Sequence, residues 1–255
     1  MLDALIVLGG GGWLPAYGRH TASTLLRDSD RAILIDAGTG VARLIEQPRL
    51  LDGVTKLDIL LTHFHLDHVA GVAYLPAIGA RAETTVWGPG RCLYGTSTRA
   101  VLGRMFHEPF HPVPFEQQSI DVRDLPGEEL ELDGMRIHLR RQNRHSAPSL
   151  GLRFDDALAW ITDTAYDEGS AAFASGCRML AHESWCTSAH PRNPDIHSSA
   201  AQAAQVAAAA GVRRLLLIHL PPFHEAIDDL VAEARADVPD ALPAHDGADV
   251  SELLA

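Results

Sequence analysis

Short apolar runs separated by glycine-rich or polar turns recur along the chain, with helix-like stretches after them. Runs of about four to eight apolar residues between turn residues predict buried β-strands. Three pairs of runs flank the polar turn 27–30, Asp133-Gly134 and Asp155-Asp156, which predicts hairpins. The predicted strands cover residues 4–8, 21–26, 32–36, 57–62, 86–88, 131–132, 135–140, 150–154, 157–161, 179–183 and 215–219.

Helix signals follow the strands in each half of the chain. The clearest helix spans residues 200–210, because Ser198 or Ser199 can cap its start and Gly211 can end it. The other predicted helices are residues 41–46, the apolar stretch from Asp67 to near Pro76, and residues 225–236. Because strands precede helices in both halves, we expect an α+β fold with two sheets packed face to face and helices outside, a four-layer αββα sandwich.

Two loops are long or unusual enough to predict a function. The glycine run 9–12 lacks a following Lys-Ser/Thr and, because position 14 is leucine, the third glycine of the dinucleotide fingerprint. We therefore interpret it as a tight turn near the functional site that uses glycine for unusual backbone angles, and not as a phosphate cradle. Residues 95–117 carry polar turns and prolines, and we expect a long loop or lid with helical parts.

The composition is that of a globular protein: 46% of the 255 residues are hydrophobic and 21% are charged. The net charge of −12 repels polyanions and argues against generic nucleic-acid binding. Three cysteines without C-x-x-C spacing suit a reducing compartment, and no apolar run approaches the ~20 residues that span a bilayer. The start has no basic segment and its apolar run ends at four glycines, so we expect neither a signal peptide nor a membrane anchor and assign the cytoplasm.

The strongest chemical signal is an H-x-H-x-D-H motif directly after the strand 57–61, formed by His63, His65, Asp67 and His68. His63 and His65 alternate, so in extended backbone they point to one side, where two neutral imidazoles can hold one Zn²⁺. Asp67 and His68 follow a turn and can serve a second metal ion. A histidine-rich surface loop is the alternative, but four fixed positions seldom match by chance, which favours metal binding.

Two ions need further ligands, and four later residues lie at the ends of predicted strands. They are His145, Asp163, Glu183 and His219. Each of them alone is more often structural, but together they follow the motif in a fixed order. Histidine is also frequent, with 14 in the chain, and it is the commonest metal ligand.

This order of residues resembles the metallo-β-lactamase superfamily over nearly the whole chain. The resemblance implies one metallo-β-lactamase-fold domain over residues 1–255 and two divalent ions, with Zn²⁺ expected and Mn²⁺ or Fe²⁺ as alternatives. It implies that His63, His65 and His145 hold the first zinc ion. It also implies that Asp67, His68 and His219 hold the second zinc ion and that the carboxylate of Asp163 bridges the two. No cysteine stands at a ligand position, which departs from the true zinc β-lactamases.

Within that superfamily, the chain looks most like the ribonuclease Z branch, over residues 8–15, 145–154, 182–184 and 197–199. The resemblance implies that Glu183 orients His197, and that His197 donates a proton to the leaving oxygen or steadies the phosphoryl charge. A solvent-exposed histidine at a helix start is the alternative for His197. The stretch from His145 to Asp163 has room for only two strands and a turn, so the long tRNA-gripping arm of ribonuclease Z is absent.

We therefore predict a dinuclear metal-dependent hydrolase that cleaves small phosphodiesters through a metal-bridging hydroxide, with Asp67, Glu183 and His197 as catalytic residues. The alternatives are a lactone, thioester or sulfate ester hydrolase on the same metals, a tRNA 3′-processing endonuclease, and a non-catalytic metal-holding scaffold. The expected partner is a small anionic ester, without extended nucleic acid or membrane, and the resemblance suggests a homodimer. Trp13 and Trp185 are expected in the core, with a pocket wall as the alternative.

Overall fold

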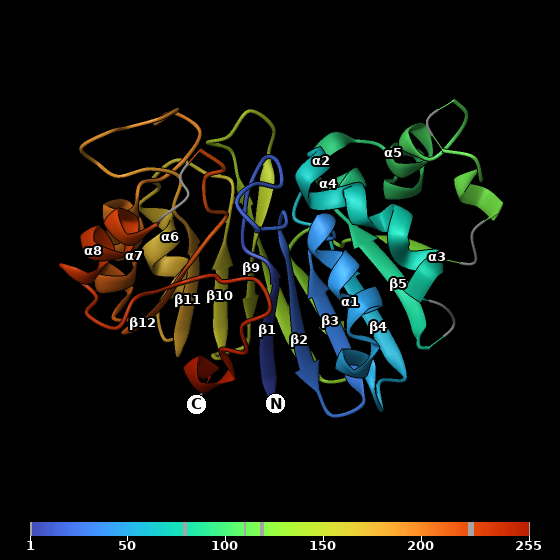
Figure 1. Ribbon diagram of the computed structural model, residues 1–255, viewed down its shortest axis with the longest axis horizontal. Helices are drawn as coiled ribbons and strands as arrows, with labels where there is room; N and C mark the ends of the chain where they lie inside the picture. The colour runs from blue at the N-terminus through green and yellow to red at the C-terminus, as the bar shows by residue number, and fades with distance from the viewer. Residues whose placement is uncertain (1, 79–80, 110, 118–119, 224–226, 255) are drawn as a thin grey trace.

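The computed structural model describes residues 2–78, 81–109, 111–117, 120–223 and 227–254. Two β-sheets form its centre, with helices on the outer side of each (Figure 1). The first sheet has the strand order β1-β2-β3-β4-β5-β6, and its neighbouring strands are parallel from β3 onward. Its strands are β1 Ala4–Gly9, β2 Ser23–Asp28, β3 Arg31–Ile35, β4 Lys56–Leu60, β5 Glu83–Gly88 and β6 Asp121–Asp124.

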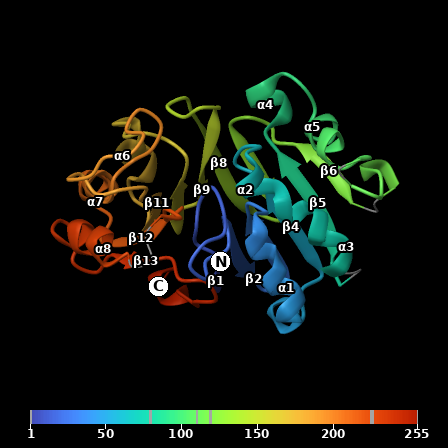
Figure 2. The ribbon, with the colours of Figure 1, turned by 45° about the horizontal axis from the view of Figure 1, so that its top comes forward.

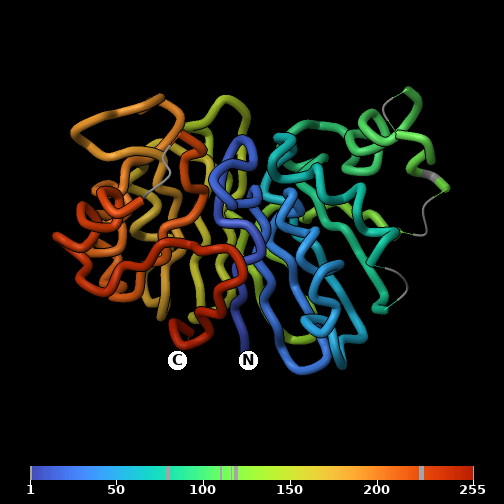
Figure 3. The backbone as a smooth tube through the Cα atoms, in the orientation of Figure 1, coloured from blue at the N-terminus to red at the C-terminus, as the bar shows by residue number. Residues whose placement is uncertain are grey.

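The second sheet has the order β13-β12-β11-β10-β9-β8-β7 and is built from the second half of the chain. Its strands are β7 Glu129–Leu132, β8 Met135–Gln142, β9 Ser149–Phe154, β10 Leu158–Ile161, β11 Met179–Glu183, β12 Arg214–Ile218 and β13 Leu242–Pro243. After β13 the chain returns to the first sheet and runs beside β1 (Figure 3), where Val250 donates a backbone hydrogen bond to Leu5. The C-terminal segment therefore links the two sheets.

Alternating side chains divide the apolar residues of each strand between two layers of core. In β1, Leu5 and Val7 face the core between the sheets, whereas Leu8 packs in the outer core of the first sheet. In β10, Leu158 faces the inner core and Ile161 the outer core of the second sheet. Strands that are apolar on both faces must be covered on both faces, which is why helices lie outside each sheet.

Helices α1, α3 and α5 pack on the first sheet, and α6, α7 and α8 pack on the second (Figure 2). The α-helices are α1 Ala42–Glu46, α2 Leu66–Val69, α3 Leu75–Ile78, α4 Gly90–Tyr94, α5 Thr98–Met105, α6 Gly169–Ala174, α7 Ala200–Ala210 and α8 Asp228–Arg235. Short 3-10 helices cover Thr39–Val41, Pro48–Leu51, Ala70–Tyr74, Phe115–Gln117 and Ser251–Leu254. In the described part of the chain, no helix is long and apolar enough to cross a membrane.

The caps of α7 are those that the sequence predicts. Ser199 accepts a hydrogen bond from the backbone of Gln202, whose side chain bonds back to Ser199, and Gly211 ends the helix in left-handed backbone. Each predicted strand is present, with boundaries shifted by a few residues. The predicted start of the last helix, residues 225–226, lies outside the described residues, and α8 begins at Asp228.

Some elements were not expected from the sequence. The strands β6 and β13 are missed because the first is polar and lies at a sheet edge and the second has only two residues. Helix α6 is short and rich in alanine and carries little periodicity. Residues 95–117, by contrast, contain the expected helical parts, α5 and the 3-10 helix Phe115–Gln117, and Leu102, Phe106 and Phe115 are buried in the outer core of the first sheet.

The loops that follow β3, β4, β10, β11 and β12 all lie at one edge of the sandwich (Figures 1 and 2). The chain leaves three of these strands through residues with left-handed backbone, Asp36 (φ 57°), Asp163 (φ 52°) and His219 (φ 51°). Non-glycine residues seldom adopt this conformation, and they gather at functional sites. The sharp turns aim these three side chains back at the sheet edge.

Candidate metal centre

A pocket of about 950 Å³ lies at this sheet edge. Its walls come from the loop after β1, the motif 63–68, and the loop 185–197 between β11 and α7. It is lined by Trp13, Leu14, His65, Leu66, Asp67, His145, Ser146, Asp163, Trp185, Pro191, Arg192, Asn193, Ile196, His197, His219 and Phe223. No described residue of 95–117 is among them, which favours the loop over the lid for the described part of that segment.

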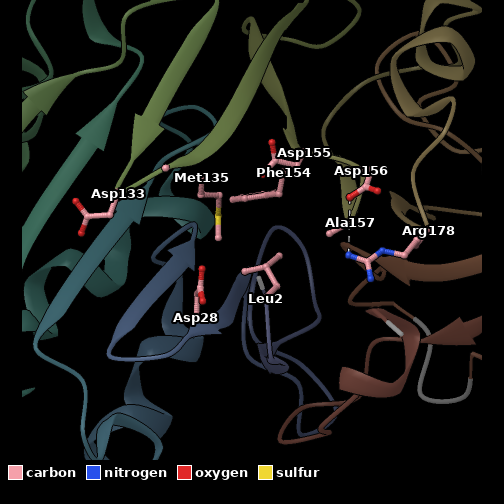
Figure 4. Close-up of a pocket in the computed structure, with 10 residues that line it drawn as sticks. Leu2, Asp28, Asp133, Met135, Phe154, Asp155, Asp156, Ala157 and Arg178 are labelled. Atoms are coloured by element: carbon pink, nitrogen blue, oxygen red, sulfur yellow. Dashed lines mark ion pairs between the residues drawn. The ribbon is translucent and has the colours of Figure 1, made fainter.

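A smaller pocket of about 390 Å³ lies at the opposite edge, among the turns β2–β3, β7–β8 and β9–β10 (Figure 4). Its floor is apolar, from Leu2, Met135 and Phe154, and acidic side chains surround it. Arg178 lies 3.9 Å from a carboxylate oxygen of Asp156. None of the described residues around this pocket belongs to a metal-ligating group. The chemistry is therefore at the other edge.

One group of ligand atoms combines His63, His65, His145 and Asp163, all within 4.8 Å of one another. Nε2 of His145 lies 3.2 Å from Nδ1 of His65 and 3.5 Å from Oδ1 of Asp163. Three imidazoles and a carboxylate at such separations match a tetrahedral zinc site in their chemistry. The three histidines are those predicted for the first ion.

A second group combines Asp67, His68 and His219. Oδ2 of Asp67 lies 3.4 Å from Nε2 of His68 and 3.3 Å from Nε2 of His219. Asp163 lies between the two groups: its Oδ1 is 3.3 Å from His219 and its Oδ2 is 3.2 Å from His68. The structure thus brings together all seven predicted ligands, with the predicted bridging carboxylate in the middle.

Two buried nitrogens of this cluster form no hydrogen bond with a described residue, although carboxylate oxygens lie near them. Nε2 of His63 lies 3.9 Å from Oδ1 of Asp163, and Nε2 of His68 lies 3.2 Å from Oδ2 of Asp163. A buried polar atom without a partner costs about 1–3 kcal/mol. A divalent ion at each nitrogen would remove that cost, so the residues fit two metal ions.

Hydrogen bonds behind the cluster aim the imidazoles. Nδ1 of His68 donates to Asp36 at 2.8 Å, and Asp36 also accepts from the backbone N–H of Thr62 at 2.7 Å. Nδ1 of His145 donates to the carbonyl of Ile196 at 2.9 Å. Each bond places the proton on Nδ1 and turns Nε2 towards the cluster, as is usual for metal-ligating histidines. Asp36 was predicted only as the end of a strand, and its position behind a motif histidine has no local sequence signal.

Burial and charge shift the pKa values in the cluster in opposite directions. Burial lowers the pKa of His63 well below its usual value, and neighbouring His68 lowers it further. Burial also disfavours a charged His68, but the carboxylates of Asp163, Asp67 and Asp36 outweigh it and raise the pKa of His68 well above its usual value. This electrostatic field favours positive charge between the carboxylates, which is the charge that a divalent ion brings.

Glu183 and His197 form a fixed pair beside the ligands. Nδ1 of His197 donates to Oε2 of Glu183 at 2.7 Å, and Oε1 of the same carboxylate accepts from the backbone N–H of Thr164 at 2.6 Å. The ring of His197 stacks on Trp185, with centroids 4.6 Å apart. His197 is 7% exposed and lines the pocket. It is therefore not the solvent-exposed helix-start histidine of the alternative interpretation.

The glycine loop lies against the metal centre, but for a different reason from the one expected. Among Gly9–Gly12, none has positive φ. A Cβ on Gly12 would overlap the ring of His219, so that glycine is needed for close approach. The backbone N–H of Trp13 donates to Oδ2 of Asp67 at 2.6 Å. The loop thus packs on one ligand and hydrogen-bonds to another.

Two tryptophans line the pocket, which makes the expected core role wrong for Trp13. Its side chain is 65% exposed, whereas Trp185 is buried and forms the pocket wall behind His197. Arg192 and Phe223 were not singled out from the sequence. They stack, with the guanidinium 4.3 Å from the ring centroid. They lie in loops without a motif, so only the fold identifies them.

Comparison with known proteins agrees with this site. A family model described as a beta-lactamase superfamily domain matches residues 31–220. The chain belongs to the metallo-β-lactamase superfamily. A superfamily relative, ribonuclease Z of Streptomyces avermitilis, is 30% identical over 278 residues and covers 91% of each chain. Such relatives place the chain in the ribonuclease Z-like branch of the superfamily, whose members are metal-dependent hydrolases.

Solved structures confirm the predicted four-layer metallo-β-lactamase fold. The metallo-β-lactamase-fold protein YhfI from Bacillus subtilis superposes with a TM-score of 0.78 at 20% identity, covering 98% of this chain and 99% of YhfI. A diphosphatase from the PhnP family superposes with a TM-score of 0.71 at 20% identity, covering 98% of this chain and 97% of the diphosphatase. The fold is therefore that of the superfamily over nearly its full length.

Proposed function

We propose that this superfamily member is a dinuclear metal-dependent phosphodiesterase acting on small phosphodiesters. The observation that carries the proposal is the Glu183–His197 hydrogen bond of 2.7 Å directly beside the ligand cluster. Two bound metal ions are enough to activate a hydroxide, but an alkoxide leaving group also needs a proton donor. A ribonuclease cleaves phosphodiester bonds, so the relative named ribonuclease Z supports the same bond type here.

The seven ligands divide between two ions, with Zn²⁺ favoured because most ligands are imidazoles, and Mn²⁺ or Fe²⁺ as alternatives. One ion would be held by His63, His65, His145 and Asp163, and the other by Asp67, His68, His219 and Asp163. Two such ions, when bound, supply a hydroxide nucleophile at neutral pH and neutralise phosphoryl charge.

Residues of this protein orient the metal ligands and would supply a proton to the leaving group. Asp36 keeps His68 turned towards the cluster, and the N–H of Trp13 holds Asp67 in place. Glu183 accepts a hydrogen bond from Nδ1 of His197 and would stabilise the imidazolium form, whose Nε2–H would donate a proton to the leaving oxygen. Trp185 excludes water from one face of that imidazole.

Small substrates are favoured over tRNA. Between His145 and Asp163 the chain forms only β9 and β10, which leaves no room for a tRNA-binding arm. Arg192 is the one Lys or Arg among the described residues that line the pocket, and the net charge is −12. Affinity for extended nucleic acid comes from many phosphate contacts by basic residues, and this surface offers few.

A lactone, thioester or sulfate ester hydrolase is the second candidate, because the metal site alone does not determine which kind of ester the hydroxide attacks. The apolar share of the pocket lining, with Leu14, Leu66 and Phe223, would suit an uncharged acyl substrate. Hydrolysis of a thioester or an aryl sulfate depends less on a proton donor, since a thiolate or an aryl oxide leaves more readily than an alkoxide.

A substrate panel separates the two candidates. Zinc-loaded and manganese-loaded protein would be assayed on bis(p-nitrophenyl) phosphate, cyclic nucleotides, γ-lactones and aryl sulfates. We expect turnover of the phosphodiesters and weak or no turnover of the others. Lactone hydrolysis without any phosphodiester turnover would refute the proposal and favour the second candidate.

A further inference from the structure

Exposed apolar side chains gather at one side of the pocket mouth. Trp13 and Leu66 are 65% and 66% exposed, and Leu14 is 41% exposed, and all three line the pocket. The hydrogen bond from the N–H of Trp13 to Asp67 keeps this rim directly beside the metal ligands. Neighbouring apolar side chains left in water at the mouth of a site mark a surface that binds something.

The conformation of Trp13 is not explained by the fold. Its φ is 64°, in the left-handed region that is a strained conformation for a bulky residue. The bond to Asp67 uses only the backbone N–H, which glycine or asparagine would supply without that strain. Both the strained backbone and the exposed indole are costs, and strain of this kind persists at ligand-binding positions.

The opposite wall carries flat rings and one cation. The guanidinium of Arg192 lies over the ring of Phe223. The rings of Phe223 and Trp185 form a T-shaped pair with centroids 5.3 Å apart, and Trp185 stacks on His197. The wall thus runs from the rim to the proposed proton donor. With the metal cluster at the bottom, the pocket combines attraction for an anion with planar surfaces, in a chain whose net charge is −12.

We propose that the indole of Trp13 stacks on the base of a nucleotide, so that the substrates are nucleotide phosphodiesters; this rests on the proposed phosphodiesterase function. A base offers a flat face that stacks on an aromatic side chain whatever its identity. Its phosphate would lie at the metal cluster, with Arg192 as the only Lys or Arg among the described residues of the pocket lining. The volume of about 950 Å³ lies in the range of small-molecule sites. An aliphatic diester would leave the indole in water.

The test uses two ligands that differ only in the base. AMP and ribose 5-phosphate would be titrated into zinc-loaded protein by calorimetry, which needs no turnover. We expect AMP to bind about tenfold more tightly, the gain typical of one stacked base. Equal affinity for the two ligands would overturn the proposal.

Trp13→Asn removes the indole and keeps a residue that tolerates left-handed backbone. We expect it to weaken AMP binding about tenfold, to leave ribose 5-phosphate binding unchanged, and to keep the metal content and Tm. Trp13→Phe should restore most of the AMP affinity. The matched control is Tyr17→Asn, since Tyr17 lies in the same loop, has φ 52° and is 56% exposed, but does not line the pocket. It should bind both ligands as the unmodified chain does.

Three outcomes would overturn the stacking role. Equal weakening of both ligands by Trp13→Asn would mean that Trp13 only shapes the metal centre. An equal effect of Tyr17→Asn would assign the loss to the loop as a whole. A dimer that dissociates in Trp13→Asn, in sedimentation measurements with unchanged AMP affinity, would assign the indole to an interface with a second copy.

The proposed phosphodiesterase function can be refuted independently of the proposed base site. Absence of turnover of every phosphodiester, with the AMP preference intact, would refute the phosphodiesterase and leave the base site standing. Turnover of bis(p-nitrophenyl) phosphate without a preference for AMP would refute the base site alone.

Discussion

The backbone N–H of Trp13 donates a 2.6 Å hydrogen bond to Oδ2 of Asp67, the oxygen that also lies 3.3 Å from Nε2 of His219. This hydrogen bond joins the glycine loop after β1 to the ligand cluster. It also fixes where the Trp13 side chain lies at the pocket mouth. A change that displaces the backbone of this loop should consequently alter the metal centre as well as the substrate preference.

Gly12→Ala is expected to disrupt the second metal site, because the added methyl group would overlap the imidazole of His219. We expect loss of about one equivalent of metal, measured by elemental analysis, and about 10²-fold lower phosphodiester turnover from misplacement of the cluster. The control is Gly18→Asn in the same loop, where the backbone is left-handed and the space is open. Full metal content and turnover in Gly12→Ala would contradict the close-packing role.

Asp36→Asn is expected to weaken metal binding by about 10–100-fold, because the amide no longer fixes the proton of His68 on Nδ1. Competition with a chelator would measure the affinity. Asp58→Asn is the matched control: Asp58 is also a buried carboxylate of the first sheet, but it bonds Trp87 and Arg31 away from the cluster. That variant should lose stability and keep its metal affinity. Similar metal affinities in both variants would contradict the orienting role of Asp36.

His197→Ala and Glu183→Gln are expected to lower kcat on alkyl phosphodiesters by about 10²–10⁴-fold with unchanged metal content. The loss should shrink for substrates with a good leaving group, such as p-nitrophenol, because these need no proton. Aryl sulfate turnover, if present, should change little, because an aryl oxide leaves without a donated proton. A loss of equal size for good and poor leaving groups would assign the pair a structural role instead of proton transfer.

Metal affinity is expected to rise with pH. Burial disfavours charged His68 and His219, but Asp163 and Asp67 outweigh it and raise the pKa of both imidazoles. The raised pKa values favour protonated imidazoles in the metal-free chain, and ligation must displace those protons. The apparent affinity should increase about tenfold per pH unit for each displaced proton below the raised pKa values, and level off above them. Calorimetry in buffers of different ionisation enthalpy would count the protons, and zero released protons would contradict the assignment.

Much of the site could be predicted from the sequence because its residues carry local signals. The spacing from His63 to His68 predicted a metal site, the resemblance to the metallo-β-lactamase superfamily implied the further ligands such as Asp163 and His219, and the structure places these side chains together. The apolar periodicity likewise identifies nearly all strands. For residues 95–117 the sequence left a long loop or a lid open, because polarity and prolines do not say which surface a segment packs on. Phe106 and Phe115 bury this segment against the first sheet.

The sequence by itself determined the fold class, the metal-ligating residue types and their order. Only the tertiary structure decided what surrounds them. Asp246 accepts hydrogen bonds from the backbone N–H groups of Gly10 and His20, more than two hundred residues away, and so helps to hold the loop that carries Trp13 at the pocket. Contacts across such separations depend on how the two sheets pack. No local pattern therefore predicts the exposed indole, the place of Arg192 or the carboxylate behind His68.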